Sequence, residues 1–421
     1  MKSAGVRKID VAVVGAGIVG ICAAVNLVEA GRSVTLFDRT GVCEETSAGN
    51  AAAFAFSDVL PLAQKGMMRQ LPGWLRDPLG PLTVSPSYLP RLMPWLFRFW
   101  RAGWVSNHDR SVAAQVALMR LAEQEWLDFL DRSGTRTMLR EHGALELYES
   151  EAEFRAALPG WDVRERHGIA FRHVEGTELA ELQPGLSPRF VKATFVPGWK
   201  NVSDPKQLGK AIFEYGRTLE GRLQFEQRSV AQVEANSGGG AQLRFADGET
   251  LSCKTLVIAA GAWSHLLAAQ LGERIPLETE RGYNTTLPAS SFDVKRQLIF
   301  PGHGFVITPL EGGLRVGGAV EFAGLERAPN YARAKAMLAK AQAFLPGLDR
   351  EGGREWMGFR PSLPDSLPVI GHARLSRDII YAFGHGHLGL TQAAATGRLV
   401  RDLAGGNVPP LDLSSFSPRR F

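Results

Sequence analysis

The sequence is poor in cysteine, has no long apolar run and carries only a small excess of positive charge. Three cysteines in 421 residues are too few and too scattered for a disulfide framework or a zinc site, so we expect no metal centre and a reducing compartment. No uninterrupted stretch of about 18 apolar residues occurs, which argues against a bilayer-spanning helix. The net charge of +5 is only weak support for nucleic-acid binding. We therefore expect a cytoplasmic protein that binds no nucleic acid.

The remaining composition is that of an ordinary globular protein. Hydrophobic residues make up 45% of the chain and charged residues 22%, which excludes a disordered or collagen-like chain. At roughly 150 residues per domain, this length indicates two or three domains. A chain of this length buries enough surface to need no disulfide or metal for stability.

The N-terminal segment can be interpreted in two ways. Basic residues precede an apolar run over residues 11–30, as in a signal peptide or a membrane helix. The run, however, contains three glycines at a motif spacing together with Asn26 and Glu29. We favour a strand, a turn and a helix, because polar residues and spaced glycines fit that interpretation better.

Residues 9–38 have the pattern of a βαβ unit. Residues 9–14 are rich in β-branched side chains and predict a buried strand, residues 21–30 predict a helix, and residues 33–37 predict a second strand. The sequence GAGIVG lies at the first turn. This is the position of the phosphate-binding turn in dinucleotide-binding folds.

Each glycine of this turn has a separate physical reason. Gly15 allows a tight turn, Gly17 lets a pyrophosphate approach the backbone, and Gly20 lets the helix lie close to the strand. The helix N-terminus then offers unpaired N–H groups to the phosphates. Asp38, at the end of the second strand, is suited to accept hydrogen bonds from an adenosine ribose and disfavours a 2′-phosphate, although the following Arg39 favours one. This unit alone does not separate NAD from FAD.

Two further segments have open interpretations. Residues 45–52 form a small, polar loop that allows close approach of a cofactor, or else an ordinary helix start with Ser47 or Asn50 as its cap. Residues 61–104 are rich in proline and tryptophan. Within them, residues 89–104 combine arginine with tryptophan and phenylalanine, which fits a pocket cover, an interdomain helix or a surface-lying membrane contact.

The rest of the chain indicates an α/β fold whose dinucleotide-binding domain is split in sequence. Residues 256–263 predict another parallel strand of that domain, and residues 275–322 predict an antiparallel sheet. Further helices are expected over residues 113–130, 204–218 and 332–344, and hairpin-like strands over 222–233 and 241–245. We predict a Rossmann-like cofactor domain from residues 1–62, 198–266 and 352–421, and an inserted α+β substrate domain from residues 63–197 and 267–351.

A second glycine-rich helix start lies near the C-terminus. Residues 379–403 predict a strand, a turn with glycines at 384, 386 and 389, and a helix from about Thr391. The positive end of a helix suits a reduced flavin, which carries negative charge near N1 and the C2 carbonyl. Two such helix starts favour one large cofactor.

At these residues the sequence resembles the bacterial D-amino-acid dehydrogenases, within the D-amino-acid-oxidase-type flavoproteins. The resemblance runs nearly end to end. It is carried by GAGIVG, the 45–52 loop, RGY at 281–283, LRVGGAVEFAG, GFRPSLPDSLPVIG and YAFGHGHLGLT. It implies non-covalent FAD, oxidation of an amine next to a carboxylate, and electron transfer to a respiratory acceptor such as a quinone, for which an artificial dye can substitute. Some relatives of this group instead accept glycine, sarcosine, proline or hydroxyproline.

Such an enzyme must hold the substrate carboxylate and direct the Cα hydride to flavin N5, and it needs no side-chain base if the amine binds deprotonated. Arginine suits the carboxylate because its guanidinium is a planar, bidentate donor. Arg360, in the GFRP motif, is our first candidate, with Arg281 and Tyr283 second and His387 third. The cofactor-binding residues that we predict are Gly15, Gly17, Ile18, Val19, Gly20, Asp38, Arg39, Thr46, Ser47, Asn50, Ala51, Ala52, Val230, Ala260, Gly261, Trp263, Arg360, His385, Gly386, His387, Leu388, Gly389, Leu390 and Thr391.

The predicted function is therefore FAD-dependent oxidation of a D-amino acid, or of a cyclic imino acid such as D-proline or hydroxyproline. The alternatives are a peroxide-forming oxidase of the same fold and a flavin-binding subunit of a multi-component dehydrogenase. An NAD dehydrogenase is the remaining alternative. We expect a location in the cytoplasm or at the inner face of the cytoplasmic membrane, with the membrane contact through residues 89–104.

Overall fold

The N-terminal βαβ unit begins the first of two large sheets in a computed structural model that describes residues 7–63 and 82–421. Strand β1 (Arg7–Val14) lies parallel to β2 (Val34–Asp38), and α1 (Ile18–Glu29) connects them. Alternate residues of β1 enter two separate hydrophobic cores, one on each face. The strand is therefore buried on both faces, as expected for a parallel sheet covered on both sides. The predicted unit is confirmed.

The first sheet is completed by segments from the middle and the end of the chain. Strand β13 (Thr250–Ile258) pairs in parallel with β1 on one side and with β20 (Ile379–Phe383) on the other. Because these strands are parallel, their carboxyl ends lie at one edge, where ligands of such sheets bind. The remaining strands are β10 (Leu223–Gln227), β11 (Val230–Ala235), β12 (Ala241–Phe245) and β19 (Val369–His372).

Helices α1 and α10 (Gly389–Gly405) pack against each other over one face of this sheet. Their contact is close because residue 397 is glycine: a Cβ there would lie 2.6 Å from the Cys22 carbonyl oxygen of α1. Both helices begin at a glycine-rich turn. The contact therefore fixes the relative positions of the two helix starts.

The second sheet is mainly antiparallel, in the order β18-β14-β17-β16-β15-β6-β8-β7, with β4 paired to β17. Strand β18 lies within the segment 352–421 that we assigned to the cofactor domain, yet it pairs with β14 over nine residue pairs. The C-terminal segment therefore forms an edge strand of the second sheet first, and only then contributes β19 and β20 to the first sheet. The strands are β4 (Leu82–Val84), β6 (Ala144–Tyr148), β7 (Arg172–Glu175), β8 (Lys192–Val196), β14 (Glu278–Leu287), β15 (Gln297–Phe300), β16 (Phe305–Leu310), β17 (Gly313–Phe322) and β18 (Arg354–Ser362).

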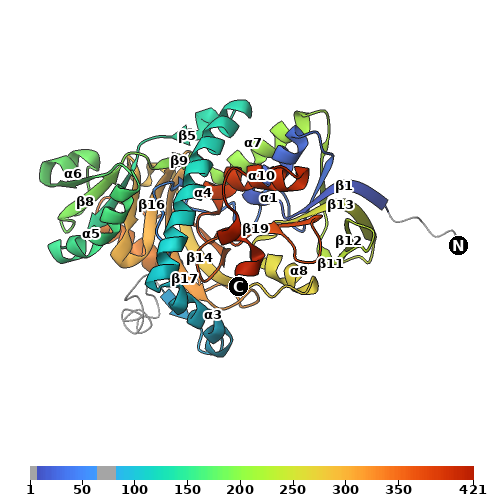
Figure 1. Ribbon diagram of the computed structural model, residues 1–421. Coiled ribbons are helices and arrows are strands. Elements are labelled where there is room, and N and C mark those ends of the chain that lie inside the picture. Colours follow the sequence, from blue (N-terminus) through green and yellow to red (C-terminus); the bar gives the residue numbers. More distant parts are fainter. Residues whose placement is uncertain (1–6, 64–81) are drawn as a thin grey trace.

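Figure 1 shows the two sheets side by side, with the long helix α4 between them. The first sheet lies on the right with α1, α7 and α10, and the second lies on the left with α5 and α6. A small third sheet has the order β3-β9-β5. Its strands are β3 (Ala53–Phe54), β5 (Leu139–Arg140) and β9 (Lys200–Val202), and the other helices are α3 (Leu89–Ala102), α4 (Val105–Arg132), α5 (Glu151–Arg166), α6 (Gly176–Leu182), α7 (Pro205–Thr218), α8 (Ser264–Gln270) and α9 (Ala332–Phe344).

The α/β class, with an antiparallel second sheet, is confirmed. Helix α9 has the predicted bounds, and α7 begins directly after Asp204, whose carboxylate accepts from the Lys206 and Gln207 N–H groups. Helix α4 is longer than predicted because its N-terminal turns continue beyond the apolar periodicity of 113–130. The hairpin predicted from residues 222–233 and 241–245 is confirmed in part: β11 pairs antiparallel with β12 across the glycines at 238–240, but β10 pairs in parallel with β2.

Part of the proline-rich segment, residues 64–81, and the first six residues lie outside the described residues. In the described part of the chain, no helix combines the length and the apolar character needed to cross a membrane.

Candidate functional site

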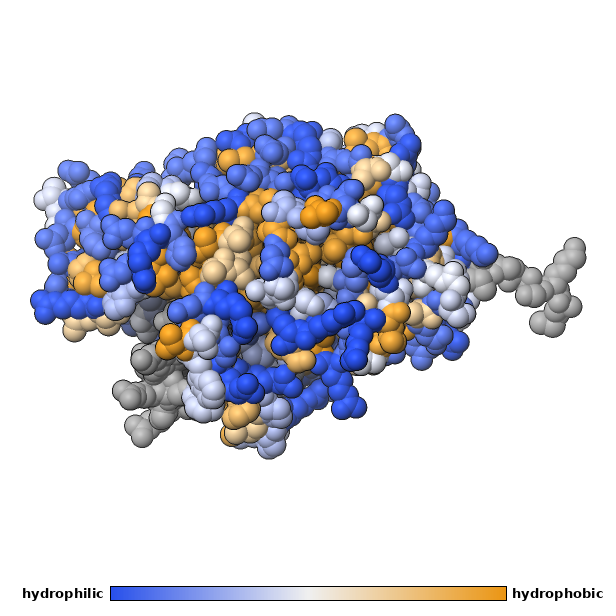
Figure 2. Space-filling view, viewed as in Figure 1, coloured by the Kyte–Doolittle hydropathy of each residue, from blue (hydrophilic) through white to orange (hydrophobic). Residues whose placement is uncertain are grey.

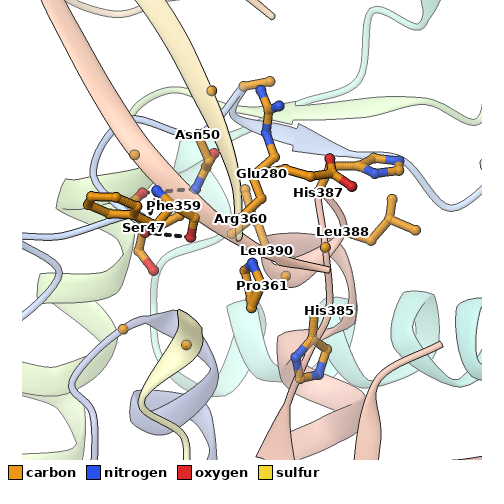
Figure 3. Close-up of a pocket in the computed structure, with 18 of the residues that line it drawn as sticks. Ser47, Asn50, Glu280, Phe359, Arg360, Pro361, His385, His387, Leu388 and Leu390 are labelled. Carbon is orange, nitrogen blue, oxygen red and sulfur yellow. Dashed lines mark hydrogen bonds between the residues drawn. The ribbon is translucent and has the colours of Figure 1, made fainter. Parts of the chain in front are cut away.

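A single cavity of about 980 Å³ connects the two glycine-rich helix starts. Gly17 at the start of α1 and Gly386 before α10 both line it, and so do residues of the second sheet. The central expectation, that the two remote helix starts converge on one site, therefore agrees with the geometry. Figure 3 shows the part of this cavity around Arg360.

The first turn has the backbone geometry that a dinucleotide requires. Gly15 has φ +108°, and a Cβ there would lie 2.3 Å from the Ala259 carbonyl oxygen of the neighbouring segment. A Cβ at Gly20 would lie 1.9 Å from the Gly15 carbonyl oxygen. Helix α1 receives no side-chain cap from its N-cap residue Gly17. Apart from the Ile18 N–H, which donates to Ser47 Oγ, its first N–H groups are therefore suited to bind phosphate.

Asp38 holds this turn closed at the end of β2. Its Oδ2 accepts a hydrogen bond from the Ala16 N–H at 2.8 Å, and its Oδ1 accepts from the Thr40 N–H at 2.9 Å. The carboxylate thus lies beside the phosphate-binding turn, where an acid suits an adenosine ribose. This position agrees with the predicted role of Asp38.

Arg39 lies at the adenosine end of the cavity, and it would have to leave its present partners to bind a 2′-phosphate. Its guanidinium stacks 3.8 Å from the ring centroid of Trp263 and pairs with Glu45 at 2.9 Å. Val230, Ala260 and Gly261 line the same end. An apolar and aromatic wall of this kind suits an adenine ring.

The loop over residues 45–52 links the start of α1 to the second sheet. Ser47 Oγ accepts from the Ile18 N–H at 3.0 Å, so the loop contacts the start of α1. Thr46 Oγ1 donates to the Phe359 carbonyl of β18 at 3.0 Å, and Asn284 Nδ2 of β14 donates to the Gly49 carbonyl at 2.8 Å. The loop therefore carries backbone groups along the cavity wall and is not a helix start. Asn50, Ala51 and Ala52 follow, and Ala52 has φ +54°.

Arg315 of β17 fastens this loop from the second sheet. It donates to the carbonyl oxygen of Asn50 at 2.5 Å, and burial lowers its pKa to about 10. Its hydrogen-bond acceptors are the carbonyl oxygens of the loop and the Thr286 hydroxyl. The charge of Asp204 opposes the lowering of its pKa. The sequence analysis missed this residue because its contacts depend on strand pairing.

The second turn is fixed next to β18. The Gly386 N–H donates to the Pro361 carbonyl at 2.8 Å, directly beside Arg360. Helix α10 begins at Gly389, and its first N–H groups have no partner within the helix. Trp126 of α4 donates to the carbonyls of Leu390 and Thr391, which holds the helix start in place. The residues from Gly386 to Thr391 all line the cavity.

The two histidines that flank Gly386 have different environments. His385 is buried, its Nε2 lies 2.9 Å from Thr396 Oγ1 of α10, and burial lowers its pKa to about 3. His387 faces the cavity with Nε2 3.1 Å from Asp58 Oδ2. In Figure 3, His385 points away from Arg360 while His387 lies on the same side as Arg360. A direct role in the site therefore suits His387 better.

Arg360 lies on β18 and faces the cavity. Its guanidinium passes over Gly282 of β14, where a Cβ would overlap it, and donates to the Ala319 carbonyl at 2.8 Å. Burial lowers its pKa, and the charge of Glu280 opposes that effect. A guanidinium so placed retains free donors for a carboxylate.

Arg281 and Tyr283, our second candidates, are not brought together with Arg360. They lie on the opposite face of β14, where both bond to Glu321 of β17. Strand alternation explains this, because residues at odd positions of β14 point away from the face that carries Gly282. Burial also raises the pKa of Tyr283 to about 12, so its hydroxyl stays protonated. Their contacts to Glu321 support a structural role; Tyr283 also lines the cavity, and a substrate contact by either residue stays a prediction.

Several residues that line the cavity were missed by the sequence analysis. Most come from segments whose position depends on long-range pairing, and only Arg315 lies in one of the motifs named above. They are Asp58, Glu146, Arg164, Trp199, Arg228, Ser229, Glu280, Gln297 and Arg315.

Comparison with known proteins agrees with this geometry. The model of the DAO family, described as FAD dependent oxidoreductase, matches residues 10–403. A D-amino-acid oxidase from Bradyrhizobium diazoefficiens is 35% identical over 418 residues, covering 98% of each chain. A D-amino acid dehydrogenase from Xanthobacter autotrophicus is 29% identical over 426 residues, covering 97% of this chain and 98% of its own.

Solved structures show the same fold. Glycine oxidase from Geobacillus kaustophilus superposes with a TM-score of 0.73 at 22% identity, over 99% of each chain. L-proline dehydrogenase from P. horikoshii also has a TM-score of 0.73, at 19% identity, over 99% of this chain and 98% of its own.

The buried His385 predicts an acid-sensitive stability. Burial lowers the pKa of this histidine from the usual 6.5 to about 3. Below pH 6.5 the histidine therefore binds a proton in the unfolded chain but stays neutral in the folded chain. Lowering the pH from 7.5 to 5 should therefore cost about 2 kcal/mol through this residue. We expect the His385→Gln variant to lose about 2 kcal/mol less than the wild type over this range, measured by urea unfolding. The exposed His142→Gln variant is the control, and an identical pH slope in all three proteins would contradict the prediction.

Proposed function

We propose that this chain, which belongs to the DAO family of FAD-dependent oxidoreductases, oxidises a D-amino acid or a cyclic imino acid such as D-proline or hydroxyproline. The product is the imino acid, which hydrolyses to the 2-oxo acid. We further propose a quinone as the electron acceptor, with an artificial dye as its substitute in an assay. Membership of this family confirms FAD as the cofactor and excludes the NAD alternative.

The observation that supports this proposal is the position of Arg360 in the cavity lined by both glycine-rich turns. A guanidinium there binds the substrate carboxylate through two parallel hydrogen bonds. The Gly386 N–H is bonded to the carbonyl of Pro361, the residue next to Arg360. This bond fixes the distance between the start of α10 and the carboxylate site. This arrangement orients the Cα–H bond and reduces the entropy lost in reaching the reactive geometry.

The residues present fit FAD without a covalent link. The first turn and Asp38 would hold the diphosphate and the ribose, the wall with Trp263 the adenine, and the start of α10 the flavin carbonyl end. The three cysteines are buried within the fold, and none of them lines the cavity. When bound, FAD supplies a two-electron acceptor for the hydride of the substrate.

The test is anaerobic reduction of the purified yellow protein by a substrate panel. We expect flavin bleaching by at least one of D-alanine, D-arginine, D-proline and hydroxyproline, and slower or no bleaching by the matching L-amino acids. Glycine and sarcosine belong in the same panel. A colourless preparation that does not take up FAD, or a flavin that no amino acid reduces, would overturn the proposal.

A peroxide-forming oxidase is the second candidate, because the Bradyrhizobium relative is a D-amino-acid oxidase. Peroxide formation in air at the rate of dye reduction would favour it over the dehydrogenase. Activity that requires a co-purifying protein would instead favour a subunit of a multi-component dehydrogenase.

Removal of the Arg360 guanidinium should raise KM while the flavin stays bound. Loss of a charge-assisted, bidentate contact costs about 2–4 kcal/mol, or roughly 30- to 900-fold in KM. We expect this change in Arg360→Ala and a smaller one in Arg360→Lys, measured by steady-state kinetics with flavin content determined in parallel. Arg354→Ala, an exposed arginine on the same strand, is the control. Unchanged kinetics in a flavin-loaded Arg360→Ala protein would remove this residue from the site.

We also propose that the protein contacts an anionic membrane surface through helix α3. One face of α3 packs through Leu92 and Trp95 onto Phe322 of β17. The opposite face exposes a stripe at helical spacing, with Phe97 56% and Trp100 44% exposed, and Figure 2 shows hydrophobic residues at the lower tip where α3 lies. Six of the ten large hydrophobic residues that are exposed in the described part of the chain lie here: Leu89, Met93, Phe97, Trp100, Trp104 and Val105.

Charge complementarity supports an anionic lipid bilayer as the partner. Arg91, Arg98 and Arg101 are exposed on α3, and no aspartate or glutamate occurs from residue 82 to 108. Aromatic residues with arginines on a helix that does not span the membrane are typical of interfacial binding. At the inner face of the cytoplasmic membrane, this contact would bring the site close to a membrane quinone.

Membrane binding should therefore depend on the exposed aromatic stripe. We expect the double variant Phe97→Ser, Trp100→Ser to bind vesicles with anionic lipid at least about tenfold more weakly than the wild type, since each large apolar side chain contributes about 1.5–3 kcal/mol. Co-sedimentation measures the binding, and Leu375→Ser is a matched control on an exposed residue elsewhere. Equal sedimentation of all three proteins, or none with the wild type, would contradict a membrane contact at α3.

A further inference from the structure

Glu280 is a buried carboxylate that faces the same cavity as Arg360. It lies two residues before Gly282 on β14, and it is opposite Arg360 in the ladder between β14 and β18. Residues two apart on a strand, and directly opposite residues on neighbouring strands, project from one face of a sheet. The Arg360 guanidinium passes over Gly282 on this face, and Asn284 of the same face reaches the cofactor loop. Along this face of β14, Glu280 therefore lies on one side of the Arg360 guanidinium, and Asn284 with the cofactor loop lies on the other.

The carboxylate of Glu280 has no bonding partner of its own. Glu280 is only 5% exposed, yet among the described residues no hydrogen bond or ion pair involves its side chain. Arg360, opposite Glu280 in the ladder, donates instead to the carbonyls of Ala319 and Gly318. A carboxylate that lines the cavity without a partner in the protein is suited to bind a cationic group that enters the site.

We propose that Glu280 is a catalytic residue that binds the α-ammonium group of the substrate and accepts its proton. This inference rests on the proposed function. An amino acid carries opposite charges two bonds apart, and adjacent strands here present a guanidinium and a carboxylate side by side. Figure 3 shows Glu280, Arg360 and His387 on one side of the site.

The proton transfer makes the substrate competent for oxidation. One N–H bond of the ammonium breaks, its proton moves to a Glu280 oxygen, and the electron pair remains on nitrogen as the neutral amine. With this pair free to form the C=N bond, the Cα hydride could leave, and bound FAD would supply the acceptor for it. The released imine leaves, and Glu280 returns its proton to water.

Two ligands that cannot be oxidised separate ammonium binding from carboxylate binding. 2-Aminoisobutyrate has both groups but no Cα–H, and isobutyrate has the carboxylate alone. Their dissociation constants are measured by the flavin spectrum of the loaded enzyme and by protection from thermal unfolding. In Glu280→Gln we expect 2-aminoisobutyrate to bind at least about tenfold more weakly and isobutyrate to change by less than about twofold. Arg360→Lys should weaken both ligands, and Glu278→Gln, two residues away and outside the cavity lining, should weaken neither.

The pH profile is a second measurement that a merely structural role would not change. The wild type should keep kcat/KM nearly constant from pH 7 to 9, because Glu280 removes the ammonium proton. In Glu280→Gln, kcat/KM should rise roughly tenfold per pH unit up to the pKa of the free amine, since only substrate that is already neutral reacts.

Several outcomes would overturn the inference. Equal weakening of both ligands would make Glu280 a positioning residue for Arg360, and no weakening would remove it from the site. Weakening confined to arginine and lysine substrates would assign it to the substrate side chain. The binding comparison needs no turnover. If 2-aminoisobutyrate binding depends on Glu280 but no amino acid reduces the flavin, the proposed function alone fails.

Discussion

The site depends on the close contact between α1 and α10. These helices come from opposite ends of the chain, and the absence of a side chain at Gly397 lets their backbones approach. The contact sets the distance between two helix N-termini, and each of these carries partial positive charge. One long, anionic cofactor can then meet both. A bulkier residue at this crossing would disturb the two ends of the cavity together.

The second sheet adds the chemistry that the first lacks. The cavity at the edge of a parallel sheet offers backbone donors, which bind phosphate but do not select a substrate. Strands β14 and β18 supply the charged groups Glu280 and Arg360, and the loop over residues 45–52 is bonded to the start of α1 and to the second sheet. Recognition of an amino acid therefore arises where the sheets meet, and neither contains the whole site.

The sequence predicted the parts of this site that depend on local geometry. The glycine spacing between two strands located the phosphate turn, because the required backbone conformations leave a direct trace in residue type. Arg360 was found through the motif that surrounds it. By contrast, Glu280, Arg281 and Tyr283 are near neighbours in sequence, and which of them face the cavity depends on the pairing of β14 with β18. The histidines beside Gly386 illustrate the same limit, since Thr396 and Asp58 determine their environments.

The path of the chain has a consequence for biosynthesis. Strand β13 receives its parallel neighbour β20 only from the last tenth of the polypeptide, and α10 follows that strand. A ribosome extends the chain from the N-terminus, so the glycine-rich turn of β1 emerges long before the helix that completes its surroundings. The part of α1 that packs against α10 must then remain uncovered for most of translation. We infer that the nascent chain is exposed to aggregation during this interval, and that capture of the cofactor follows release from the ribosome.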